Sequence, residues 1–171
     1  MSKDTQRQRN LTVTDKLTIG PNAVVRRRLT GNKGYDILFP LSSTHQVITT
    51  TKTVSAAETG THFILNTATA FVSTLPAVEV GLEYWFHVGA TEPTTSHTIV
   101  TASSANIING NICSPEDAAG SVSVAVDSDT ISFIASKALH GDFAHVWCDG
   151  TNWYLDGMCT VQDGMTATQA T

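Results

Sequence analysis

Cysteine is scarce in this chain of 171 residues, which contains only Cys113, Cys148 and Cys159. An odd number of thiols without C-x-x-C spacing fits neither a disulfide framework nor a zinc cluster. The sequence also lacks an apolar run near the ~18 residues that a membrane-spanning helix needs, and it opens on no charged-then-apolar secretory leader. We therefore expect reduced thiols, synthesis in a cytoplasm and no membrane partner.

Basic residues are missing from most of the chain. Residues 53–171 contain a single basic residue, Lys137, against twelve acidic ones, which gives a net charge of −11. Residues 1–52 contain nine basic residues against three acidic ones, a net charge of +6, so that the whole chain carries −5. This division favours a basic segment that meets an acidic partner and an acidic body that faces solvent. A chance distribution of surface charge is the simpler alternative.

Good helix formers are also few, whereas Thr occurs 26 times and Val, Ile, Ser and Gly are plentiful. Short runs rich in branched and aromatic residues recur roughly every 8–12 residues, with Gly, Pro, Asn or Asp between most of them. Branched side chains separated by turn formers are typical of pleated strands. The pattern predicts an all-β protein, an antiparallel β-sandwich or barrel of jelly-roll-like form.

Three segments are expected along the chain. Residues 1–44 are polar and basic, with few apolar residues to build a core, and we predict an extended basic N-terminal arm. Residues 45–160 hold the series of β-rich runs and form the predicted sandwich or barrel domain. Residues 161–171 are small and polar, and we expect a flexible C-terminal tail.

Two local patterns indicate hairpins. In residues 58–76, two apolar runs flank a link of small residues. The stretch DGTNWYLDG at 149–157 begins with an Asp-Gly turn signal, and its alternation predicts Trp153 and Leu155 on one side of a strand. This stretch is best interpreted as architecture. A sugar-binding platform remains the alternative, because Trp147 and Trp153 could share a face.

No motif for catalysis is present: the sequence has no G-x-S-x-G elbow, no P-loop and no G-x-G-x-x-G. In HGDFAH, His140 and Asp142 share one side of an extended strand and His145 takes the other, so three metal ligands do not converge. We expect no enzyme activity, no metal site and no cofactor. The sequence leaves open whether single histidines gather around an ion at an oligomer axis.

The triplet Arg26, Arg27 and Arg28 is the sharpest local feature of the basic segment. On an extended strand it presents guanidinium groups on both sides, suited to bidentate contact with carboxylates or phosphates. Nucleic acid is the less favoured partner, since no aromatic residue interleaves with the arginines to stack on bases. An exposed edge strand that uses charge against aggregation is the structural alternative.

A resemblance extends over roughly residues 53–157, about 105 of the 171 positions. Its segments are ETGTHFILNTATAFVSTLPAVEVGLEYWFHVG, HTIVTASSANIING and DTISFIASKALHGDFAHVWCDGTNWYLDG. Together they resemble a pattern of strands and turns common in virion proteins of tailed bacteriophages. Proteins of this kind are often capsid decoration (cement) proteins or the base domains of head and tail fibres, usually trimeric.

The resemblance implies a structural role in a virion. With the charge division, it predicts a non-enzymatic decoration protein that binds the outer surface of the expanded head shell and stabilises it. The expected partner is the major capsid protein, and Arg26, Arg27 and Arg28 are the expected capsid contacts. We expect a homotrimer on the exterior of the phage head, made in the cytoplasm of the host bacterium.

Two other classes of function compete with this prediction. The first is a tail or head fibre module that attaches to host surface glycans through its aromatic hairpins. The second is a hydrolase acting on cell-surface polysaccharide, which no sequence motif supports.

Overall fold

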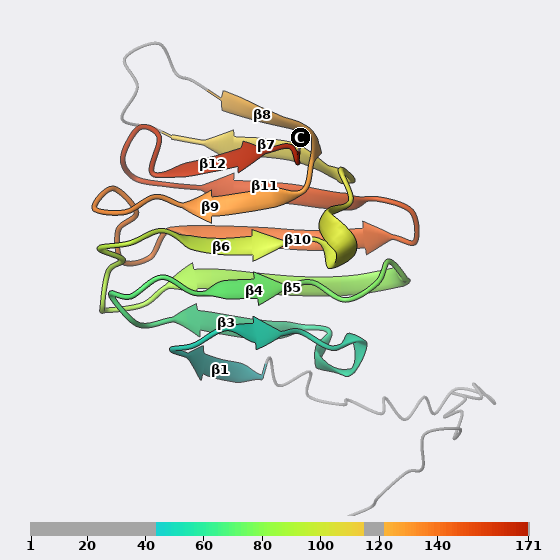
Figure 1. The fold of residues 1–171 in the computed structure, drawn as a ribbon, viewed down its shortest axis with the longest axis horizontal. Helices are drawn as coiled ribbons and strands as arrows, with labels where there is room; N and C mark the ends of the chain where they lie inside the picture. The colour runs from blue at the N-terminus through green and yellow to red at the C-terminus, as the bar shows by residue number, and fades with distance from the viewer. Residues whose placement is uncertain (1–43, 115–121, 171) are drawn as a thin grey trace, which may run out of the picture. The chain divides into compact units, whose positions relative to one another are not determined.

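The computed structural model describes residues 44–114 and 122–170, and in this part of the chain two β-sheets lie face to face (Figure 1). The seven-stranded sheet contains, in spatial order, β1 (His45–Ile48), β3 (Thr61–Leu65), β5 (Val80–Val88), β10 (Phe143–Asp149), β11 (Trp153–Met158), β7 (Ile108–Cys113) and β8 (Val122–Ser128). The five-stranded sheet contains β12 (Met165–Thr168), β9 (Thr130–Phe133), β6 (His97–Val100), β4 (Val72–Thr74) and β2 (Lys52–Thr53).

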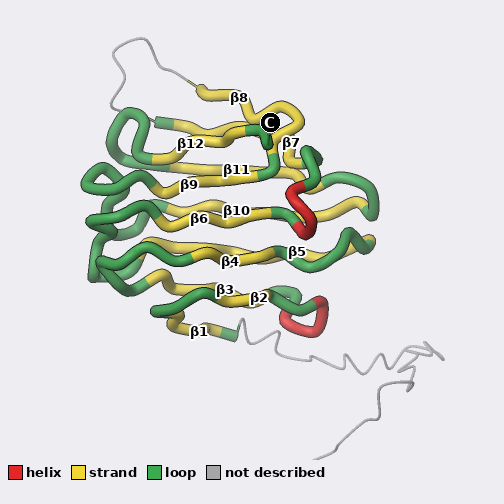
Figure 2. Tube along the Cα trace, viewed as in Figure 1, coloured by secondary structure: helices red, strands yellow, loops and turns green. Residues whose placement is uncertain are grey.

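The predicted all-β class is confirmed, and the architecture is a sandwich of two separate sheets. Within the described residues, the helical elements are two short 3-10 turns, η1 (Ala56–Glu58) and η2 (Ala102–Ser104), which lie outside the two sheets (Figure 2). Frequent branched residues and short runs between turn formers account for this class.

Strand pairing is mixed, although the sequence predicts an antiparallel arrangement. From β1 to β6 the chain alternates between the two sheets, so β1, β3 and β5 are parallel neighbours in one sheet. In the other sheet β2, β4 and β6 are parallel neighbours in the same way. Parallel neighbours need a crossover connection, and here a strand of the opposite sheet provides it. The hairpin predicted at residues 58–76 is wrong for this reason, since β3 and β4 belong to different sheets.

The hairpin predicted around Asp149 is confirmed, since β10 and β11 pair antiparallel with Trp147 opposite Tyr154. Gly150 adopts a positive φ of 97° in the turn, a conformation that costs glycine little. The Asp149 carboxylate stabilises the turn by accepting hydrogen bonds from the backbone N–H groups of Thr151 and Asn152, each at 2.8 Å. The stretch is therefore a structural hairpin.

Alternating residues of both sheets form the core between them. The largest side chains fully enclosed there include Trp153, Tyr84, Phe63, Phe86 and Phe133. Tyr84 brings a hydroxyl into this core and donates it to the Ser55 carbonyl oxygen at 3.0 Å. Burial raises the pKa of Tyr84 to about 12. The phenol is therefore a neutral donor at neutral pH.

The predicted flexible tail at residues 161–171 is wrong. It contains β12, which pairs antiparallel with β9. Met165 explains the difference, because its side chain is buried in the core at 2% exposure. A tail rich in small polar residues is held by this apolar anchor, by Ala167 packed against the core, and by a strand ladder. The predicted arm at residues 1–44 lies outside the described residues except for Thr44, and β1 begins at His45.

Candidate functional site

The sequence-predicted contact residues Arg26, Arg27 and Arg28 lie outside the described residues. In the described part of the chain, the surface that stands out is the outward face of the seven-stranded sheet, which we call the ring face. Its ring-bearing residues are His45, His62, Trp85, His87, Phe143, His145, Trp147 and Tyr154. Sequence reasoning missed it, because these rings are far apart along the chain.

Strand register explains why the rings lie together. Alternate residues of a strand point to the same side of a sheet, and neighbours opposite each other in register meet across the strands. One continuous row crosses the whole ring face in this way: His45, His62, Trp85, His145, Asp156, Asn111 and Val124. The next row, one pleat further along, is Val47, Ile64, His87, Phe143, Met158, Cys113 and Val122.

Trp85 is the centre of the stacked rings. Its indole lies 4.0 Å from the His145 ring, centroid to centroid, with an interplanar angle of 10°. On the other side it lies 5.4 Å from the His62 ring with an angle of 4°. Nearby, the Trp147 and Tyr154 rings stack at 4.3 Å and 17°. Stacked cross-strand aromatic pairs of this kind stabilise a sheet.

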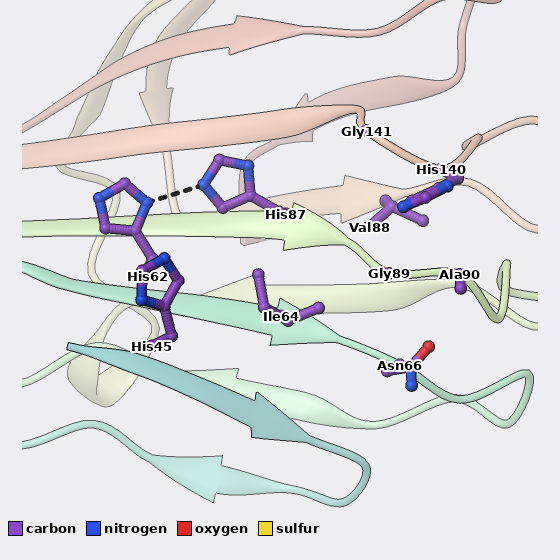
Figure 3. A pocket seen from close by; sticks show the side chains of 10 residues that line it. All are labelled: His45, His62, Ile64, Asn66, His87, Val88, Gly89, Ala90, His140 and Gly141. Carbon is purple, nitrogen blue, oxygen red and sulfur yellow. Dashed lines mark hydrogen bonds between the residues drawn. The ribbon is translucent and has the colours of Figure 1, made fainter. Parts of the chain in front are cut away.

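His62 and His87 are joined by a hydrogen bond of 3.0 Å between Nδ1 of His62 and Nε2 of His87 (Figure 3). Burial is the main cause that lowers the pKa of His62, and the nearby His45 ring adds to it. Burial also lowers the pKa of His87, followed by the effects of His62 and His45. Both rings are therefore neutral at pH 7, and one N–H group donates to the lone pair of the other ring.

An open pocket of about 500 Å³ lies beside this pair and is lined by His45, His62, His87, Ile64, Asn66 and the 88–90 and 140–141 segments. His140 also lines it, but at the far end from the other three rings (Figure 3). Within the described residues, no group of three or more His, Cys, Asp or Glu side chains is arranged to hold a metal ion.

His145 is held between two carboxylates. Its Nε2 lies 2.9 Å from Glu83 Oε1, and its Nδ1 lies 3.9 Å from Asp156 Oδ2. Both ring nitrogens thus face acidic partners, and neither is directed at a hydroxyl or thiol that it could activate. This is not the arrangement of a general base beside a nucleophile.

The residues of HGDFAH are separated by the fold, and they do not lie on one strand as the sequence predicts, because β10 begins at Phe143. Asp142 is buried, and its carboxylate accepts hydrogen bonds from the backbone N–H groups of Leu139 and Thr160 and from the Thr160 hydroxyl. His145 lies on the ring face, and His140 is in the preceding loop. Asp142 is therefore a structural carboxylate that fixes the loop before β10.

The sugar-site alternative rested on Trp147 and Trp153 sharing a face, and this expectation is wrong. Trp153 is fully buried in the core, whereas Trp147 is 40% exposed on the ring face. The two residues occupy opposite sides of the sheet because Trp153 pairs with Cys148, one residue beyond Trp147. The exposed aromatic pair is Trp147 with Tyr154.

The outward face of the five-stranded sheet has a different chemistry. One row across it is Thr53, Thr74, Val100, Thr130 and Thr168, and the next is Val72, Thr98, Ser132 and Thr166. We call this the threonine face. Hydroxyl groups bond well to water, so a polar outer face is what a solvated sheet needs. The ring face departs from this pattern, and this contrast identifies it as the candidate functional surface.

Comparison with known proteins does not assign a family, since no family model, curated protein or solved structure matches the chain. In the described residues, no helix is long and apolar enough to cross a membrane. All three cysteines have free thiols.

Proposed function

We propose that the protein is a non-enzymatic decoration (cement) protein of a tailed-bacteriophage virion. In this proposal a homotrimer binds the outer surface of the expanded head shell and stabilises it. The major capsid protein is its partner, and the protein is made in the cytoplasm of the host bacterium. The role needs a stable β-domain and adhesive contacts, and no cofactor.

The observation that carries the proposal is the division of the chain into two chemically opposite parts. The sandwich begins at His45, and residues 53–171 carry a net charge of −11. The preceding residues carry most of the basic side chains, including the Arg26–Arg28 triplet. The resemblance of residues 53–157 to phage virion proteins supports the same assignment.

The stabilising effect follows from multivalency and linkage. Three basic segments on one trimer contact neighbouring capsid subunits together, so modest contacts add up to strong attachment. A ligand that binds only the expanded shell stabilises that shell in proportion to its occupancy. Guanidinium forks suit carboxylates on an acidic shell surface, and such contacts weaken as salt screens them.

The test is cryo-electron microscopy of the purified protein mixed with undecorated, expanded shells of its own phage. We expect ordered density on the outer surface, with lower occupancy at high salt. The triple Arg26→Ala, Arg27→Ala, Arg28→Ala variant should lose at least about tenfold in affinity, as removal of several charge-assisted contacts costs more than 1.4 kcal/mol.

Replacing the same three arginines with lysine provides the matched control. Lysine keeps the charge but lacks the planar fork, so partial binding by this variant separates bidentate recognition from simple charge attraction. If the triple alanine variant decorates shells as well as the wild type, the arginines are not the capsid contact. If the wild type leaves shells bare at both salt concentrations, the decoration proposal itself fails.

A fibre module that binds host glycans is the second candidate, and one observation favours it. Trp147 is 40% exposed and stacks on Tyr154, with Glu83 opposite it in register on β5. An exposed indole beside polar groups is a common contact for the apolar face of a sugar ring. Glycan-array binding that disappears in Trp147→Ala, together with bare shells, would select this function.

A further inference from the structure

We propose that the ring face is where copies of this chain meet, so that three ring faces surround the axis of a homotrimer. This inference identifies the surface through which the trimer of the proposed function would assemble. It rests partly on that function, which assigns the basic segment to the shell and so leaves the β-domain to form the trimer. The observation behind this inference is an apolar row that crosses the whole ring face from β1 to β8.

The first argument is the composition of that row. From β1 to β8 it reads Val47, Ile64, His87, Phe143, Met158, Cys113 and Val122, with no charged side chain. Val47 is 61% exposed, Val122 52% and Met158 45%. Single exposed apolar residues are ordinary, but a continuous exposed stripe marks an interaction surface. Aromatic residues and Met are enriched, and charges depleted, at the core of permanent interfaces.

Charge distinguishes other copies of this chain from other occupants. An acidic domain repels its own copies unless the surfaces that meet carry little net charge. On the central strands of the ring face the acidic residues are Glu83 and Asp156, which are directed at His145, and Asp149, which accepts a hydrogen bond from the Tyr154 hydroxyl. The His87 ring, which lies in the apolar row, is uncharged at neutral pH, because burial lowers its pKa. The row from Val47 to Val122 is thus an uncharged stripe on an acidic domain, along which copies of the chain can meet with the least repulsion.

The dimensions of the ring face limit the area that each copy can bury. Seven strands spaced about 4.8 Å apart, with about 3.3 Å of rise per residue along the seven residues of β10, give a face of about 29 by 23 Å. Side-chain relief increases the accessible area of such a face. In a trimer each copy divides this face between two neighbours, so each contact lies at the small end of the range for specific interfaces.

In a trimer with threefold symmetry, each copy contacts its two neighbours through two different patches, because the contacts are head-to-tail and therefore heterologous. The ring face has two. The half formed by β1, β3, β5 and β10 carries most of the rings, and the half formed by β7 and β8 carries the exposed valines Val122 and Val124. If the ring face of each copy faces the threefold axis, the ring half of one copy lies beside the valine half of the next.

The test measures the mass of the full-length protein by native mass spectrometry and light scattering. We expect three times the chain mass of 18.2 kDa. Trp147→Glu and Val124→Glu each place a charge in the interface and should raise the dissociation constant at least about 30-fold, as for a central anchor. Val72→Glu is the matched control: Val72 is an exposed valine on the threonine face, and its variant should stay trimeric.

Circular dichroism and thermal melting show whether each variant is folded. Hydrogen exchange of the wild type, above and below the dissociation concentration, needs no variant and should show slower exchange in β5 and β10 in the assembled state. A trimer that persists in both ring-face variants, or a wild type without concentration-dependent protection there, overturns the assignment of this face.

The outcomes also separate this inference from the proposed function. A monomeric wild type that still decorates shells overturns the inference and leaves the decoration proposal standing, with the capsid as the occupant to examine next. A wild-type dimer lost in Trp147→Glu keeps the face but overturns the threefold assembly. A trimer that fails to bind shells supports the inference and removes the decoration proposal.

Discussion

His97 shows what one buried imidazole requires of its surroundings. It is 1% exposed, and its Nε2 donates to the Thr67 carbonyl oxygen at 2.8 Å. Its Nδ1 has no hydrogen-bond partner within the described residues. Burial is the main cause that lowers the pKa of His97, although the bond to Thr67 opposes the shift. The neutral ring fits this site, whereas protonation would add an unpaired buried donor.

Stability should therefore depend on pH through His97. The folded state binds fewer protons than the unfolded chain once the pH falls below about 6.5, the ordinary value for imidazole. This contribution to stability is complete above that pH and is lost as the pH falls below it. We expect the melting temperature to drop between pH 7.5 and 5.0, and to drop less in His97→Gln, which keeps an amide donor for Thr67.

Thermal melts of both proteins at the two pH values make the comparison. His97→Gln should be slightly less stable at pH 7.5, by about 1 kcal/mol, as its amide replaces a well-aligned hydrogen bond. Equal drops in melting temperature for the wild type and the variant would show that the titration of His97 does not contribute. His62 and His87 titrate in both proteins and so cancel in the comparison.

At the scale of single residues, sequence reasoning succeeded where local periodicity decides. Trp153 and Leu155 were assigned to one side of their strand, and both are buried. It failed for Trp147 and Trp153, because that assignment depended on the number of residues in the turn. Pairing of Cys148 with Trp153 shifts the two tryptophans onto opposite sides. A one-residue difference in register reverses every side chain.

Among the elements, the β7–β11 pair depends on a glycine. Gly110 is opposite Leu155 in this parallel pair, and a Cβ atom at Gly110 would overlap the Leu155 carbonyl oxygen. Only backbone can occupy that space, so the two strands approach closely there. We expect Gly110→Ala to lower the free energy of unfolding by on the order of 3 kcal/mol, the upper range for an overpacked core site.

Gly60→Ala is the matched control for this prediction. Gly60 has a positive φ of 79°, but a Cβ atom there would meet no atom within 4 Å. The change should cost about 1 kcal/mol of backbone strain and no packing energy. Urea denaturation of both variants measures the difference. A Gly110→Ala protein as stable as Gly60→Ala would mean that β7 can move away from β11 at little cost.

The order of the elements was the part of the fold that local patterns could not supply. Strand-like runs were predicted nearly throughout residues 45–160, but β3 and β4 were assigned to one hairpin. A short link of small residues serves equally well to turn within a sheet or to cross to the opposite sheet. The choice depends on which partner strands bury Phe63 and Leu75 together, a non-local property of the chain. The ring face was missed for the same reason.

For the whole molecule, the central question is whether the sandwich and the residues before it act independently. Contacts divide the chain into two units, residues 1–41 and 42–171. The second unit contains both sheets and the entire described core. A unit that encloses its own core should fold without help from the first.

Removal of residues 1–43 tests this independence. We expect the shortened protein to keep the melting temperature of the full chain within about 2 °C, a shift of less than about 1 kcal/mol for a domain of this size. It should also keep the trimer, because the ring face lies wholly within residues 44–170. Binding to expanded shells should be lost, since the basic residues assigned to capsid contact are gone. Calorimetry, native mass spectrometry and shell sedimentation measure the three properties separately.

Melting temperature, trimer formation and shell binding can each be lost without the others. The deletion therefore shows which of the two units is responsible for each property. A large fall in melting temperature would mean that the sandwich needs the preceding residues to complete its core. A monomer that melts normally would place the trimer contacts in residues 1–43 and remove them from the ring face. Undiminished shell binding would move capsid recognition to the acidic domain. There the apolar row and the exposed rings of the ring face are the surface most able to bind a shell without electrostatic attraction.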